Sequence, residues 1–258
     1  MNTLITKEIQ QYISKYPTLN EIDNYWRTPL VGYAKANDPL FFELKSVVSP
    51  SHAHPNDLLT DAKTVIAFFI PFIKEIPKSN IKEKDCSDLW AESYIATNLL
   101  IKDLSIHLDK FLLEQGHQSK IIPATHNFDE EKLLSDWSHR HIAYIAGLGT
   151  FGINNMLITT EGCGGRLGSL ITTAEISPSS RPDHEYCLYK FDHSCKRCME
   201  RCVNHAFADM QFDRFRCYKM CLDNNARLTQ FGTTDVCGKC MVGVPCTFTD
   251  PTKKRLHT

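Results

Sequence analysis

The spacing of apolar residues predicts alternating helices and strands over the first part of the chain. Apolar residues recur every four positions from Ile5 to Ile13, which predicts an amphipathic helix at the start of the sequence. The β-branched and aromatic segment 64–70 is expected to form a central strand. Residues 88–115 carry apolar positions at helical spacing and predict a long helix, which Gly116 is expected to end.

The segments around these elements complete the expected layer domain. Residues 18–60 are punctuated by proline and asparagine, and we expect loops with short elements there. Asp129 is expected to cap a helix that runs through Ile145 and is closed by Gly147. Short strands are expected over 120–123, 156–160 and 169–174. This order of elements indicates an α+β fold rather than repeated βαβ units.

Composition adds a few constraints to this picture. The longest apolar run, 65–73, holds nine residues, far fewer than the roughly 20 that a membrane helix needs. The first residues mix charged and apolar side chains and contain no signal-peptide core. We therefore expect a soluble, cytoplasmic protein without a membrane partner. The formal net charge of −1 gives no argument for a nucleic-acid partner.

Cysteine dominates the last part of the chain. Beyond Pro178 the apolar pattern gives way to closely spaced cysteines, which predicts two domains, 1–180 and 181–258. Nine of the eleven cysteines lie between Cys187 and Cys246. An odd number of cysteines, crowded into one part of the chain, favours metal ligation over disulfides.

Two cysteine runs resemble each other and predict two metal centres. The runs are Cys195-x2-Cys198-x3-Cys202 and Cys237-x2-Cys240-x5-Cys246. In two-cluster ferredoxins the last cysteine of each run ligates the other cluster, so the pair of clusters needs eight thiolates. The predicted ligands of two [4Fe–4S] clusters are Cys187, Cys195, Cys198 and Cys246 for the first, and Cys202, Cys217, Cys237 and Cys240 for the second.

This cysteine pattern leaves two alternatives open. Asp192 stands where the first cysteine of a ferredoxin run would lie, so Cys187 is taken as a displaced ligand and Cys221 as the spare thiol. Either of these two cysteines could be the eighth ligand. Zinc is the second alternative, because two zinc ions could also use eight thiols. The gap of 38 residues between the two CxxC pairs exceeds the roughly 15–20 residues of a zinc ribbon.

Gly147, Gly149 and Gly152 match the letters of a dinucleotide-binding GxGxxG loop. Such a loop follows a strand and opens a helix. Here a helical pattern precedes the glycines and a strand pattern follows them, which argues against NAD. The glycines permit close backbone approach, either to a large flat cofactor or to packed protein.

A resemblance to the epoxyqueuosine reductase family rests on Arg140, on AGLGTFGINNMLIT at 146–159, on GCGGRLGSLITTAEI at 162–176 and on the cysteine runs. That family shares its architecture with reductive dehalogenases. The resemblance implies a nitroreductase-like cobalamin-binding domain followed by a C-terminal two-cluster ferredoxin-like domain. It therefore implies cobalamin, two [4Fe–4S] clusters and an external electron donor. Nitroreductase-like folds also host flavin, so the choice between cobalamin and flavin stays open.

The resemblance also suggests site residues around the glycine loop. The catalytic candidates are Asp136, Arg140 and Tyr144, and the cofactor-binding candidates are His139, Gly147, Gly149, Gly152, Arg166 and Ser169. The family's catalytic aspartate lies seven residues before its arginine, where this chain has Leu133. The sequence also ends twelve residues after Cys246, without the family's tRNA-gripping extension. This short form is therefore not expected to act on tRNA.

Three functions are compatible with the sequence. The first is a corrinoid-dependent iron–sulfur reductase of a small organic substrate, which predicts cobalt binding and turnover. The second is an electron-transfer or corrinoid-reducing protein that acts on a partner corrinoid protein and has no substrate of its own. The third is a zinc-stabilised interaction module without a redox role, which predicts a colourless protein.

Overall fold

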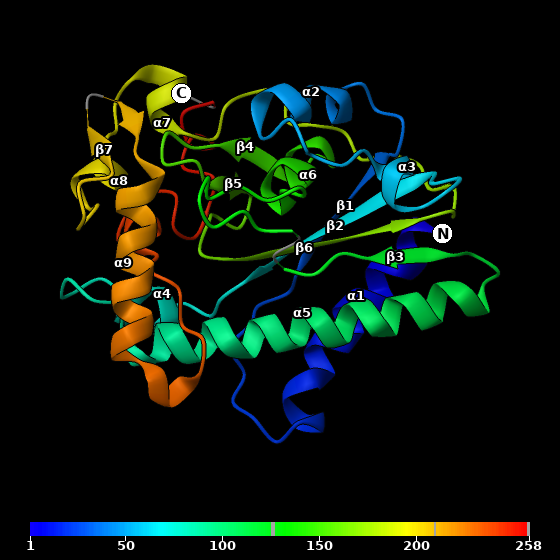
Figure 1. Cartoon of the computed structure of the whole chain (residues 1–258), viewed down its shortest axis with the longest axis horizontal. Helices are drawn as coiled ribbons and strands as arrows, with labels where there is room; N and C mark the ends of the chain where they lie inside the picture. Colours follow the sequence, from blue (N-terminus) through cyan, green and yellow to red (C-terminus); the bar gives the residue numbers. More distant parts are fainter. Residues whose placement is uncertain (125–126, 209, 257–258) are drawn as a thin grey trace. The chain divides into compact units, whose positions relative to one another are not determined.

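A computed structural model describes residues 1–124, 127–208 and 210–256 of the chain (Figure 1). The chain forms two compact units, and each unit is built from three segments. The first unit comprises Met1–Ile70, Leu99–Leu148 and Arg166–Pro182, and the second comprises Pro71–Asn98, Gly149–Gly165 and Asp183–Thr258. The single predicted division near residue 180 coincides with one of these boundaries, but it misses the earlier segments that join the second unit.

The first unit is organised by a four-stranded sheet. Its strands are β1 (Leu30–Lys35), β2 (Thr64–Pro71), β6 (Gly165–Thr172) and β3 (Ser119–Ile121), in that spatial order. β1 runs antiparallel to β2, with Leu30 opposite Phe69 and Lys35 opposite Thr64. Every residue of β2 is buried, which confirms the predicted central strand.

Helices cover both sides of this sheet. They are α1 (Asn2–Leu19), α2 (Leu40–Val47), α3 (Pro55–Leu58), α6 (His139–Ile145) and part of α5 (Asp88–Glu114). Figure 1 shows α1 and α5 along one side of the sheet, and α2 and α6 along the other. α1 buries the isoleucines that predicted it, and the Tyr16 hydroxyl donates to Asp103 of α5 over 2.6 Å. The long helix and its stop at Gly116, where φ is +81°, are also confirmed.

The second unit is built from short elements. They are α4 (Glu75–Ser79), β4 (Gly149–Phe151), β5 (Leu157–Thr159), α7 (Leu188–Asp192), α8 (Arg197–Glu200), β7 (Phe207–Ala208), β8 (Gln211–Phe212), α9 (Arg214–Arg227) and the 3-10 turns η1 (Thr229–Phe231) and η2 (Lys239–Met241). β4 and β5 form an antiparallel hairpin. The segment after this hairpin is fastened to the end of the cysteine array, because the Cys163 amide donates to the Cys246 carbonyl over 2.9 Å.

Gly162 makes that attachment possible. Its φ is +83°, and a Cβ atom there would lie 2.4 Å from the Thr247 carbonyl oxygen. The next glycine, Gly164, donates its amide to the same carbonyl over 3.0 Å. Only a residue without a side chain tolerates both the left-handed backbone and this approach of two main chains.

One prediction of local structure was wrong. The helix expected from Asp129 to Ile145 is shorter, since α6 begins only at His139. Asp129 caps a tight turn instead: its side chain accepts from two following amides, and its backbone is bridged to Leu134. Leu133 has a left-handed φ of +52°, which is incompatible with a continuous helix. Residues 18–60 contain short elements among loops, as expected, and one of them is the strand β1.

Within the described part of the chain, no helix combines the length and apolar character needed to cross a bilayer.

Candidate functional site

Four cysteines surround one cavity in the second unit. Its volume is about 320 Å³, which includes space open to solvent. Its lining consists of Gly152, Ile153, Asn154, Ile158, Cys187, Leu188, Cys195, Cys198, Val244, Pro245, Cys246 and Pro251. Among these described residues none is charged, so thiols are the chemically reactive groups that face the cavity. They are the four cysteines predicted as the first set.

Short helices position these thiols. Cys187 occupies the N-cap of α7, and Cys198 lies within α8. Burial, followed by the neighbouring Cys246 and Cys187, raises the pKa of the Cys198 thiol to about 12. Cys163 stands behind the cavity: its contact with Cys246, together with burial, raises the pKa of its own thiol. Burial therefore opposes ionisation of Cys198, whereas the hydrogen bond from Cys163 lowers the pKa of Cys246.

The cysteines of the second predicted set lie after α8, in α9 and around η2. Cys202 follows α8 and accepts from the Ala206 amide over 3.2 Å, while Cys217 lies in α9. Cys237 and Cys240 flank the start of η2. Burial, and then the charges of Cys217 and Cys237, raise the pKa of Cys240.

Cys221, the predicted spare thiol, lies one helical turn after Cys217 on α9. The contact with Cys217, followed by burial, raises the pKa of Cys221. Cys221 is therefore close enough to the second set to replace one of its members.

All eleven cysteines are free thiols. Among the described residues, no three histidine, cysteine or carboxylate side chains converge tightly enough to hold one metal ion. In the described part of the chain, the cysteines therefore form no disulfide, and no three of them lie close enough together to hold a single metal ion.

A tryptophan that the sequence analysis passed over lies against the second set. The ring of Trp90 packs on Gly238, and a Cβ at Gly238 would lie 2.2 Å from the ring atom Cζ2. Trp90 is 3% exposed, and in the described part of the chain its Nε1–H has no hydrogen-bond acceptor. Buried N–H groups are rarely left in this state. An acceptor beside Cys237 and Cys240, such as a sulfur atom, would satisfy it.

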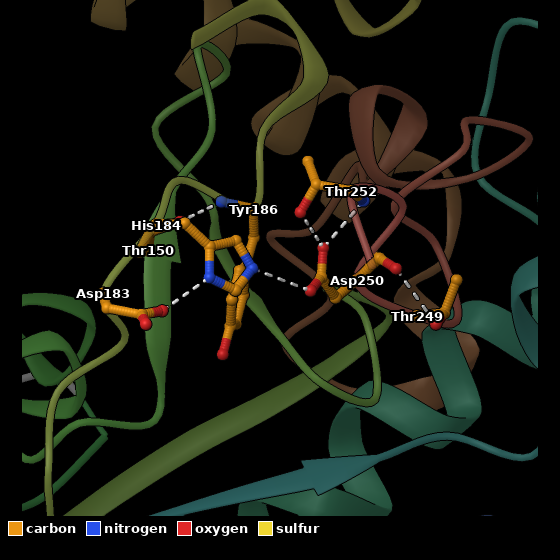
Figure 2. Close-up of polar contacts among 7 residues, drawn as sticks. All are labelled: Thr150, Asp183, His184, Tyr186, Thr249, Asp250 and Thr252. Carbon is orange, nitrogen blue, oxygen red and sulfur yellow. Dashed lines mark hydrogen bonds and ion pairs between the residues drawn. The ribbon is translucent and has the colours of Figure 1, made fainter. Parts of the chain in front are cut away.

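A histidine joins the two chain segments that carry Cys187 and Cys246. Figure 2 shows His184 between Asp183, 2.7 Å from Nδ1, and Asp250, 3.4 Å from Nε2. The hydrogen bond that His184 donates to Asp183, more than the one it donates to Asp250, raises the pKa of His184 against the opposing effect of desolvation.

Asp250 is held in turn by residue 252, whose amide and hydroxyl both donate to it. Hydrogen bonds through His184 and Asp250 therefore hold segments 183–187 and 246–252 together.

In the first unit, two of the cofactor-binding candidates are used inside the protein. The Nε2–H of His139 donates to the Pro123 carbonyl over 2.9 Å, so its Nδ1 accepts from the Ser169 hydroxyl over 2.8 Å. Ser169 also accepts from Trp137 Nε1 over 2.9 Å. Both candidates are buried, and the hydrogen bonds of both ring nitrogens and of the hydroxyl are made within the unit.

The glycine candidates also pack against protein. A Cβ at Gly147 would lie 2.5 Å from the Ser180 carbonyl oxygen. At Gly149 it would lie 1.9 Å from a main-chain oxygen of β5, and at Gly152 it would lie 2.6 Å from the Asn154 side chain. Of the two uses left open for these glycines, the structure shows the packing of protein.

The other candidates lie on or near α6 and β6. Asp136 precedes α6 and accepts from the Ser51 hydroxyl over 2.5 Å. Arg140 and Tyr144 are both exposed and lie one turn apart on α6, so they share a face. Arg166 is half-buried in β6. Arg140 and Tyr144 are the candidates that present side chains outward.

Comparisons with known proteins support the fold. No protein-family model matches the chain, and no curated protein sequence matches it. Epoxyqueuosine reductase from Bacillus subtilis is similar in structure, with 18% identity, a TM-score of 0.56, and coverage of 94% of this chain and 66% of that one. The enzyme from Streptococcus thermophilus is similar at 19% identity and a TM-score of 0.53, covering 93% and 68%. The catabolic reductive dehalogenase NpRdhA is similar at 16% identity and a TM-score of 0.59, covering 88% and 31%.

The chain thus spans about two thirds of the length of these epoxyqueuosine reductases and about a third of the dehalogenase. At these identities, the likeness shows a shared mixed α/β fold.

Proposed function

We propose that this protein is an iron–sulfur oxidoreductase whose two cysteine sets hold two [4Fe–4S] clusters. The observation that carries the proposal is the gathering of Cys187, Cys195, Cys198 and Cys246 around one uncharged cavity. Cys246 lies 48 residues after Cys198 in the sequence, and no disulfide links the four cysteines. Soft thiolates are the ligands that iron–sulfur clusters use.

Cluster chemistry accounts for the spacing of the thiols better than zinc does. Four thiolates around one zinc ion, each about 2.3 Å from it, would lie within about 4 Å of one another. In the described part of the chain no three donors converge in this way. A cubane places its four ligands on separate iron atoms, so its cysteines stand further apart.

Two features of the protein fit a buried cluster. The first cavity is lined mostly by apolar residues and cysteines, and the polarity around a cluster is one of the factors that set its potential. The unpaired Nε1–H of Trp90, beside Gly238, offers a donor to sulfur at the second set. When bound, such clusters supply one-electron transfer at low potential.

The buried thiols of the two sets must lose protons when metal is loaded. Burial raises the pKa of Cys198 to about 12 and that of Cys237 to about 11. Metal ligation requires the thiolate, so the positive charge of iron must compensate for desolvation. Binding of the clusters therefore releases protons. The hydrogen bond between His184 and Asp250 holds together the two segments that carry Cys187 and Cys246.

We further propose a corrinoid as the guest of the larger, first domain and a small organic compound as the substrate. The shared fold with epoxyqueuosine reductases and a reductive dehalogenase supports this proposal. Arg140 and Tyr144 are the residues of this chain that could contact the guest or substrate, whereas His139 and Ser169 position the start of α6. Leu133, which has no carboxyl group, speaks against epoxyqueuosine-tRNA.

Anaerobic purification with metal analysis tests the proposal. We expect about eight iron and about eight sulfide per chain, a brown protein, and bleaching of its visible absorption on reduction. Hydroxocobalamin should then change the visible spectrum and bind in a fixed ratio. Zinc without iron would refute the iron–sulfur assignment. Clusters without cobalamin binding would leave an electron-transfer protein and remove the corrinoid.

A further inference from the structure

A lysine side chain is buried inside the second cysteine set. Lys239 lies between Cys237 and Cys240 and is 1% exposed. Its Nζ donates to the main-chain carbonyl oxygens of Asn80, at 2.9 Å, and Lys82, at 2.7 Å. Lysine is almost never fully buried unless its charge is compensated.

The carbonyl partners are dipoles and leave the charge of Lys239 uncompensated. In the described part of the chain, no carboxylate forms an ion pair with its Nζ. The cysteines that flank Lys239 in the CxxC run are Cys237 and Cys240, both predicted ligands of the second cluster.

A cluster held by four thiolates is an anion, and its reduction adds one more negative charge. A fixed positive charge in a medium of low dielectric constant stabilises the reduced form more than the oxidised form. We infer that Lys239 raises the reduction potential of the cluster bound by Cys237 and Cys240. This inference rests on the proposed function, and it assigns to one side chain the control of one cluster.

The first cluster offers an internal control. No charged side chain is among the described residues that line its cavity. A change at Lys239 should therefore act on one cluster and leave the other nearly unchanged.

Redox titration of the full-length protein, reconstituted anaerobically and followed by electron paramagnetic resonance, tests this inference. The variants are Lys239→Gln and Lys239→Met, which remove the charge, and Lys239→Arg, which retains it. Lys219→Gln is the matched control, because Lys219 is exposed in the same unit and pairs with Asp223 over 2.7 Å.

At the wild-type midpoint, each neutral variant should raise the ratio of oxidised to reduced second cluster at least tenfold, a shift of about 59 mV for one electron. The first cluster, Lys239→Arg and Lys219→Gln should each stay within about threefold of wild type.

Three results would overturn the inference. The neutral variants could titrate like wild type, or both clusters could shift equally. Alternatively, both neutral variants could lose the second cluster's iron while Lys239→Arg keeps it, which would show that the ammonium only anchors residues 80–82. A wild-type protein without iron and sulfide would refute the proposed function itself, and the iron assay separates that failure from the other three.

Discussion

Replacing Gly238 with alanine should weaken the second unit by two separable effects. Gly238 has a φ of +71°, and the left-handed region costs an alanine about 1–2 kcal/mol. The new Cβ would also stand 2.2 Å from Cζ2 of Trp90, a rigid ring that cannot move away cheaply. Overpacking of this kind costs about 1–3 kcal/mol more. We therefore expect a total loss of about 2–5 kcal/mol.

Gly243 provides the matched control for this substitution. Its φ is +67°, and the atoms nearest to a Cβ there belong to the guanidinium of Arg201, at 3.3 Å rather than 2.2 Å. Gly243→Ala should therefore cost about 1–2 kcal/mol from the backbone alone. Anaerobic urea unfolding of the reconstituted protein, followed by circular dichroism, measures both variants. Equal losses would refute the placement of Trp90 against Gly238.

Three further predictions address the site and the first unit. Cys198→Ser should lose about half of the iron, while Cys221→Ser should keep all of it, as measured by iron per chain; equal retention would contradict the assigned ligands. His184→Gln should destabilise the protein most at acidic pH, because the pKa of His184 is raised in the folded state. The contribution of protonated His184 to the free energy of unfolding is complete below the unfolded pKa, about 6.5, and is lost as pH rises through the folded pKa. The loss, read from thermal unfolding across pH, should stay below about 1 kcal/mol since the ring is partly solvated, and a pH-independent loss would contradict it. Ser169→Ala should cost about 2–4 kcal/mol in thermal unfolding, because it strips a partner from His139 and a buried indole; a cost near zero would mean that this network is not formed.

Local sequence patterns predicted two kinds of element: helices with a regular apolar spacing and a strand that is buried on both faces. The strand β2 is apolar at nearly every position because both of its faces are covered. α5 and its stop at Gly116 follow from periodicity and from the left-handed backbone that glycine accepts.

The failures came from choices that tertiary contacts decide. An aspartate side chain that accepts from the following main-chain amides, as Asp129 does, can begin either a helix or a turn. Here Leu133 adopts a left-handed φ, and the chain forms a turn. β1 shows no strong pattern of its own because its pairing with β2 determines it.

The candidate site divides in the same way. CxxC spacing brings two thiols together by itself, and the four cysteines predicted as the first set do line one cavity; the assignment of all eight ligands stays a prediction. The burial of Lys239 and the packing of Trp90 on Gly238 depend on residues 71–98, which lie far away in sequence. Spacing cannot reveal such contacts. The glycines at 147, 149 and 152 left two uses open for a related reason. A glycine permits close approach of either a ligand or a neighbouring strand, and the sequence does not distinguish the two.

The attachment of Gly162 and Cys163 to the main chain at Cys246 and Thr247 has a consequence for biosynthesis. A ribosome makes residues 149–165 long before it makes their partners, so the hairpin emerges with unfilled backbone contacts. A fragment that ends at residue 180 would lack these partners, and one that begins after it would lack the hairpin. The first proposed cluster site can therefore be completed only after Cys246 and Thr247 have been made.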